Sequence, residues 1–160
     1  MKKVAFILLF ALVGITSASA QFEKGKKYVG ASVSGFDMSY SETTKFHFGL
    51  DAKAGYMIAR DWMILGQLGF NYHNSDAHEF SFGASGRYYI EQNGIFLSVG
   101  AKYVHEWKAF NDFVVTPEVG YCFFLNRKVT LEPSIYFDMS MTKFGDRSRF
   151  GLKVGLGFFL

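Results

Sequence analysis

The sequence predicts an all-β protein in which eight antiparallel strands follow one another as an up-and-down meander and close into a barrel. The main observation is an alternation of apolar with polar or small residues at a period of two, which is the side-chain spacing of a β-strand. The second is the composition: 19 Phe, 9 Tyr and 17 Gly occur with only 2 Pro in 160 residues. Aromatic residues favour strands, whereas Pro interrupts them. The third is the recurrence of turn residues between the alternating segments.

The clearest alternation runs through residues 46–58, where an apolar row from Phe46 to Ile58 opposes polar and small residues. The segment from Lys27 to Tyr40 is less regular, because its apolar residues change from one face to the other. A β-bulge near Gly35 would restore a single apolar face. Six further segments alternate regularly: 62–73, 80–90, 95–106, 113–123, 129–140 and 149–160.

Turn residues separate these segments. Those at 59–61, 91–94 and 126–127 mark one end of the barrel, and those at 41–44, 74–78, 108–111 and 142–146 mark the other. An even strand count lets both ends of the barrel chain lie on the same side of a membrane, as bacterial barrels require.

Residues 1–20 are predicted to be a signal peptide, and residues 21–160 to form one β-barrel domain. Lys2 and Lys3 precede an apolar run, and the triplet 18–20 (Ala-Ser-Ala) fits an A-x-A cleavage site. The alternative is a single membrane anchor, but the apolar run is short for a membrane-spanning helix. We therefore expect an exported protein.

The two faces of the strands differ in chemistry, and this difference indicates which face lies inside. A water-soluble barrel encloses its apolar face, whereas a membrane-spanning barrel turns that face toward lipid. Gly and Ser fall mostly on the charged face, and a narrow lumen needs small residues. The charged face is also balanced, as a closed interior requires. Its predicted lumenal charge network consists of Asp51, Glu106, Glu118, Glu132 and Asp138 with Lys53, Arg87, Lys102, Arg149 and Lys153.

The apolar rows carry almost no charge over roughly ten residues, the length with which a tilted strand crosses a bilayer. Aromatic residues near the strand ends, such as Trp62 and Phe113, are placed to form interfacial girdles. We therefore predict an eight-stranded transmembrane β-barrel with Leu68, Leu97 and Leu131 outside and Glu118 and Lys153 inside.

The end of the sequence resembles the terminal signal that the outer-membrane assembly machinery reads. Lys153, Gly155, Phe158 and Leu160 supply a polar residue, a glycine, an aromatic residue and a final hydrophobic residue. Leu160 departs from the Phe that usually ends this signal. The resemblance implies the assembly machinery as a partner during biogenesis.

Residues 86–89 (Gly-Arg-Tyr-Tyr), residues 117–121 (Pro-Glu-Val-Gly-Tyr) and the Gly-rich last strand resemble the small outer membrane β-barrel domain family. This is a porin-like family of the OmpA/OmpX transmembrane type. The resemblance implies an integral protein of the Gram-negative outer membrane, with lipid as its surroundings. We expect a monomer.

Composition excludes several other classes. Two of the three net positive charges lie on Lys2 and Lys3, so the barrel itself is close to neutral and a nucleic-acid partner is not expected. Cys122 is the single cysteine, so no intrachain disulfide forms, and we interpret it as a buried small hydrophobic residue. No phosphate-binding loop, cysteine pair or HExxH motif occurs, and no cofactor or metal is expected.

The leading functional hypothesis is a non-enzymatic envelope-structural or surface-interaction protein with a lumen filled by side chains, since eight strands leave little interior space. A narrow porin-like channel is one alternative. A lipid A-modifying enzyme is a second, because His73 and Ser75 form an H-x-S triplet near Asp76. With His78 these groups could also ligate zinc. A third alternative is a soluble periplasmic ligand-binding barrel.

Overall fold

The computed structural model describes residues 22–39, 48–72, 78–90, 93–106, 110–142 and 148–160, except for the side chains of some residues at strand ends. The strands are β1 (Lys27–Ser39), β2 (Phe48–Ala59), β3 (Trp62–Tyr72), β4 (His78–Tyr89), β5 (Ile95–Glu106), β6 (Phe110–Tyr121), β7 (Phe123–Phe124), β8 (Val129–Ser140) and β9 (Arg149–Phe159).

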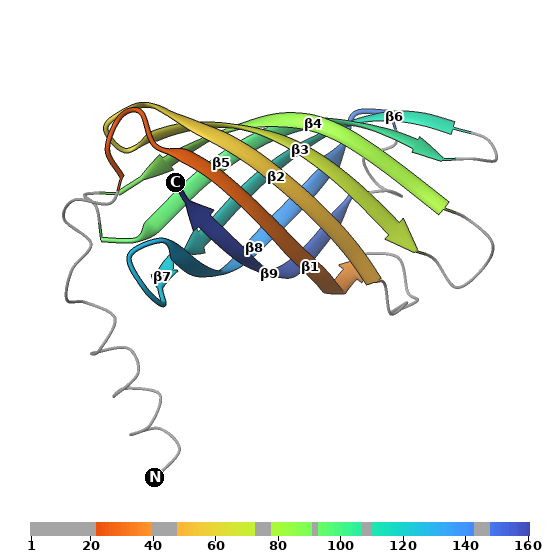
Figure 1. Ribbon diagram of the computed structural model, residues 1–160. Helices are drawn as coiled ribbons and strands as arrows, with labels where there is room; N and C mark the ends of the chain where they lie inside the picture. Colours follow the sequence, from red (N-terminus) through yellow and green to blue (C-terminus); the bar gives the residue numbers. More distant parts are fainter. Residues whose placement is uncertain (1–21, 40–47, 73–77, 91–92, 107–109, 143–147) are drawn as a thin grey trace, which may run out of the picture.

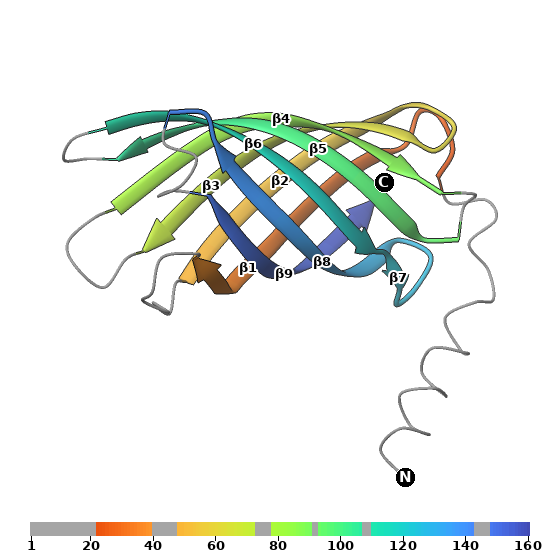
Figure 2. The same cartoon turned by 180° about the vertical axis from the view of Figure 1, so that it is seen from behind.

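All strand pairings are antiparallel, and the sheet closes on itself. Neighbours follow the order β6-β5-β4-β3-β2-β1-β9-β8, and β8 pairs back with β6. β7 has only two residues, continues β6 beyond Cys122 and also pairs with β8. The predicted eight-stranded up-and-down barrel is therefore confirmed, with β6 and β7 together forming one strand. Figures 1 and 2, which view the barrel from opposite sides, show the strands crossing it obliquely.

The expected irregularity in the first strand is present. The pairing of β1 with β9 shifts register between Ser34 and Phe36, so Gly35 is the extra residue. At the β2–β3 turn, Asp61 adopts a φ of 64°, a conformation that Asp tolerates better than most residues other than Gly. This turn can therefore stay tight.

Apolar side chains point outward and charged ones inward, as predicted for a membrane barrel. Leu68 and Leu97 are 54% and 47% exposed, whereas Lys153 is 9% exposed. Along β9 the buried and exposed positions alternate without interruption up to Leu160. This orientation excludes a soluble barrel that would enclose its apolar face.

The connections 60–61, 90–94 and 125–128 lie at one end of the barrel, which we call the inner end, together with Leu160. The two longest connections, 40–47 and 141–148, lie at the outer end. Outer-membrane barrels carry their longer loops on the extracellular side, so we take the inner end as the periplasmic end. Among the described residues, no helix has the length and apolar character needed to cross a membrane.

Candidate functional site

The inner half of the lumen is organised around the carboxylate of Glu132. Arg87 Nη1 donates a hydrogen bond to Glu132 Oε2 at 2.8 Å, and Tyr28 Oη donates to the same oxygen at 3.0 Å. Thr130 Oγ1 donates to Oε1 at 2.9 Å, and Cys122 Sγ lies 3.7 Å from that oxygen. Because these groups come from β1, β4 and β8 and from the residue after β6, the cluster ties distant parts of the barrel wall together.

The guanidinium of Arg87 is fully buried and partly satisfied by aromatic groups. Its carbon lies 3.9 Å from the centroid of the Phe96 ring and 5.7 Å from that of Tyr28. Nη1 also approaches Tyr89 Oη at 3.4 Å, while Nε and Nη2 have no hydrogen-bond partner among the described residues. Stacking on ring faces offsets part of the cost of burying this cation.

An aromatic layer closes the inner end below this cluster. Phe22, which precedes β1, is fully buried and stacks on Tyr89 with 3.8 Å between ring centroids. Phe124 and Phe159 surround it at centroid distances of 5.5 and 5.8 Å. The segment is held by backbone hydrogen bonds, including one from Asp61 N to Phe22 O at 3.1 Å. The chain ahead of β1 thus folds into the mouth of the barrel.

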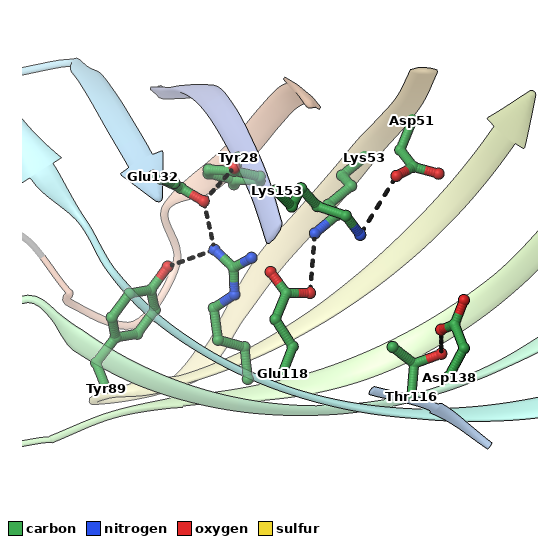
Figure 3. A network of polar contacts seen from close by, with 10 residues as sticks. Tyr28, Asp51, Lys53, Tyr89, Thr116, Glu118, Glu132, Asp138 and Lys153 are labelled. Atoms are coloured by element: carbon green, nitrogen blue, oxygen red, sulfur yellow. Dashed lines mark hydrogen bonds and ion pairs between the residues drawn. The ribbon is translucent and has the colours of Figure 1, made fainter. Parts of the chain in front are cut away.

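The middle of the lumen holds two ion pairs that cross between strands. Lys53 Nζ lies 3.4 Å from Glu118 Oε2, and Lys153 Nζ lies 3.3 Å from Asp51 Oδ2. Lys153 also sits 4.6 Å from the centroid of the Tyr136 ring. Figure 3 shows Glu118, Lys53 and Lys153 between the Glu132 cluster and Asp138.

The outer half of the lumen has a third set of paired groups. Lys102 Nζ lies 2.7 Å from Asp138 Oδ2, and Thr116 Oγ1 donates to Asp138 Oδ1 at 2.6 Å. These side chains are more exposed than Arg87 and Glu132. Nearer the outer end, Arg149 lies 3.8 Å from Glu79.

The ten residues named from the sequence as a lumenal charge network are placed as follows. The four acids Asp51, Glu118, Glu132 and Asp138 each pair with one of the named bases. Arg149 pairs instead with an acid that the sequence analysis did not include. The side chain of Glu106 lies outside the described part of the structure. In the C-terminal segment, Gly155 faces the lumen and Phe158 faces outward.

Several residues of the lumenal clusters were not identified from the sequence. Phe22 lies outside the alternating segments, so nothing marked it as buried. Tyr28 and Thr130 occupy inward positions, but the alternation does not say which lumenal groups they meet. Glu79 stands near the start of β4, where the pattern is weak. Cys122 is free and buried, as interpreted, although its thiol also meets the Glu132 carboxylate.

Two small cavities lie between these groups. A cavity of about 10 Å³ is lined by residues that include Asp51, Gln67 and Lys102. A second of about 10 Å³ lies beside Tyr28 and Glu132. Each has roughly the volume that one water requires.

Within the described ranges, no group of three or more His, Cys, Asp or Glu side chains is arranged to hold a metal ion. His73, Ser75 and Asp76, on which the enzyme hypothesis depends, lie outside the described residues, and so does the side chain of His78. The zinc hypothesis depends on the same loop.

A closed antiparallel barrel with an apolar exterior and a paired polar lumen defines a small transmembrane β-barrel protein. Consistent with this class, residues 6–160 match the model of the outer membrane protein beta-barrel domain family. The chain belongs to this family, which places it in the outer membrane. No curated protein matches the sequence.

Solved structures of the same architecture are similar in fold and distant in sequence. The N-terminal β-barrel domain of Pseudomonas aeruginosa OprF has a TM-score of 0.62 at 10% identity, covering 86% of this chain and 98% of that one. Neisserial surface protein A has a TM-score of 0.60 at 18% identity, covering 84% and 97%. Ail, the attachment invasion locus protein of Yersinia pestis, has 0.54 at 13%, covering 86% and 99%.

Proposed function

We propose that this protein is a monomeric, non-enzymatic barrel that serves the structure of the outer membrane or interactions at the cell surface, and that its lumen is filled by its own side chains. The observation that carries the proposal is the Glu132 cluster. Arg87 and Glu132 pair at 2.8 Å with their side chains 0% and 4% exposed. A continuous water path through the inner half would have to pass this pair.

The arrangement of the cluster favours a fixed structural role over one in which the cluster opens to let ions pass. Glu132 accepts hydrogen bonds from donors on both of its oxygens, so little of its acceptor capacity is left for a passing ion. The aromatic layer around Phe22 covers the inner side of the same cluster. Opening a path would separate a buried ion pair and also remove Phe22 from its contact with Tyr89.

Planar-bilayer recording tests the filled lumen. The wild-type barrel is expected to give no steady channel conductance. The triple variant Phe22→Ser/Arg87→Ser/Glu132→Ser removes both charges and the ring that covers them at the inner mouth, and is expected to conduct. The matched control is Lys102→Ser/Asp138→Ser, which removes an ion pair from the outer half and leaves the inner plug in place. Steady conductance by the wild type would favour the narrow-channel alternative.

The role of the protein in the cell is tested with a deletion strain. An envelope-structural role predicts increased sensitivity to detergents, whereas a surface-interaction role predicts normal sensitivity and reduced binding to other surfaces. A non-enzymatic protein also predicts that lipid A from a strain carrying His73→Ala/Ser75→Ala is identical to that of the parent. Altered lipid A would contradict the proposal and favour the enzyme.

We also propose that the signal peptide is removed after Ala20 during export. The basic start at Lys2 and Lys3, the apolar run that follows and the Ala-Ser-Ala triplet at 18–20 support this proposal. N-terminal sequencing of the protein from outer-membrane fractions should begin at Gln21.

A further inference from the structure

The inner end of the barrel carries more bases than acids. Its segments 22–28, 58–62, 90–95 and 125–129 contain six bases and three acids in the sequence. The connections at the outer end, residues 35–48, 72–80, 104–114 and 140–150, contain seven acids and five bases in the sequence. Positive charge is therefore concentrated at the periplasmic end. The bases there are Lys24, Lys26, Lys27, Arg60, Arg127 and Lys128, which we call the basic arc.

The basic arc occupies one side of the barrel rim. Lys27 N donates to Leu160 O at 3.0 Å, and Phe159 N donates to Lys128 O at 2.7 Å, so Lys27 and Lys128 flank the end of β9. Arg60 lies in the β2–β3 turn, and β2 pairs with β1. The bases thus span the adjacent strand ends of β3, β2, β1, β9 and β8. Residues 90–94, on the opposite side, include no base.

Bases of this arc continue the rows of side chains that face lipid. Lys27 is exposed and stands two residues before the outward Val29. Arg60, whose side chain is 75% exposed, stands between the outward residues Ile58 and Trp62. Arg127 follows the outward Leu125 by two residues. Long basic side chains beside such a row can lay their methylene groups on apolar surface and present the charge at headgroup level.

We propose that the basic arc binds the phosphates of anionic glycerophospholipids in the periplasmic leaflet, so that this side of the barrel selects anionic over zwitterionic lipid. The bases lie in the rows that face lipid, and this favours lipid as the ligand. A water-borne anionic polymer in the periplasm would be bound by bases that point away from the membrane. Asp61 lies 3.9 Å from Arg60, and the acids at this end are fewer than the bases. The inference does not depend on whether the lumen conducts.

The two tryptophans of the chain offer a local measurement. In a Trp107→Phe background, Trp62 remains as the single fluorophore, outward-facing and two residues from Arg60. The protein is reconstituted in bilayers that mix phosphatidylglycerol with phosphatidylcholine, one of which is brominated on its acyl chains. Quenching of Trp62 then gives the relative binding constant of the two lipids at this site.

At low salt, we expect phosphatidylglycerol to bind beside Trp62 about 5-fold more strongly than phosphatidylcholine. One basic residue near an anionic surface contributes about that factor. The preference should shrink toward equality as salt screens the charges. Lys27→Gln/Arg60→Gln should abolish it. Glu23→Gln, which removes an exposed acid from the same segment, should maintain or increase it.

A reporter on the side without bases completes the test. In a Trp62→Phe/Trp107→Phe background, Ile95→Trp places the fluorophore at an outward position of β5 and should show no preference. Circular dichroism confirms that each variant is folded, and the single variant Arg60→Gln replaces the double variant if needed. Equal binding of both lipids at Trp62, or equal preference at Trp62 and position 95, would overturn the proposal. The proposal would also be overturned if the substitutions abolished co-sedimentation with isolated peptidoglycan and left the lipid preference unchanged.

Discussion

Glu132 is the residue on which most of the inner lumen converges, since Arg87, Tyr28 and Thr130 all donate to it. The charged residues of the lumen could be predicted from the sequence, because they lie on the same face of each strand as Gly and Ser. The ion pairs that they form could not be predicted. Asp51 and Lys53 are two residues apart on one face of β2, yet each pairs with a residue of a different strand. Such pairs depend on strand tilt and stagger, which alternation alone does not determine.

The Arg87–Glu132 pair should dominate the stability of the lumen. Arg87→Met leaves the Glu132 carboxylate buried without its cation, and we expect the free energy of unfolding to fall by about 3–5 kcal/mol. Arg87→Met/Glu132→Gln should recover a large part of that loss, because no buried charge remains unpaired. Urea unfolding in detergent micelles, followed by tryptophan fluorescence, measures both.

Lys102→Met is the matched control for this prediction. Lys102 and Asp138 are also paired, but their side chains are 17% and 14% exposed, so water can solvate the remaining carboxylate. The loss should be clearly smaller than that of Arg87→Met. Equal losses would show that burial does not set the energy of these pairs.

Among the strands, parity was the most informative feature of the sequence. The change of parity in the segment from Lys27 to Tyr40 correctly indicated the bulge at Gly35. The interruption at Cys122, between β6 and β7, was not indicated, because Tyr121 and Phe123 continue the same apolar row. Phe22 was also missed. A short segment that enters the barrel mouth is held by tertiary contacts and leaves no periodic pattern.

Glycines in the strands differ in how much space a Cβ atom would have, and Gly157 and Gly86 can be compared directly. A Cβ at Gly157 of β9 would lie 2.5 Å from Tyr28 Cε2 and 2.7 Å from Glu132 Oε1, whereas one at Gly86 of β4 would meet nothing within 4 Å. Gly157→Ala should therefore destabilise the barrel by about 1–3 kcal/mol through overpacking. Gly86→Ala should be neutral or slightly stabilising, since Ala restricts the unfolded chain more than Gly does. Urea unfolding compares them, and equal effects would contradict tight packing at Gly157.

For the whole molecule, barrel closure and the orientation of its faces could be derived from the sequence. An even number of alternating strands, turn residues between them and charges confined to one parity are compatible with few other folds. The gathering of bases on one side of the rim could not be derived from the sequence, because it depends on which strands are neighbours in the closed barrel. Lys27 and Lys128 are far apart in the chain, and they become near neighbours because the last strand pairs with both β1 and β8.

The proposed assembly signal acts on the unfolded chain, so it can be separated from the stability of the folded barrel. Phe158 and Phe150 are both on β9, both face outward and are 46% and 44% exposed. Phe158→Ala and Phe150→Ala should therefore weaken the folded barrel by similar amounts, on the order of 1–2 kcal/mol, and both should refold in detergent micelles. In cells, only Phe158→Ala should greatly reduce the amount of protein in the outer membrane, because only Phe158 belongs to the terminal signal. Quantitative immunoblotting of membrane fractions measures this amount. Equal losses for both variants in cells would assign the effect to stability and contradict a signal at Phe158.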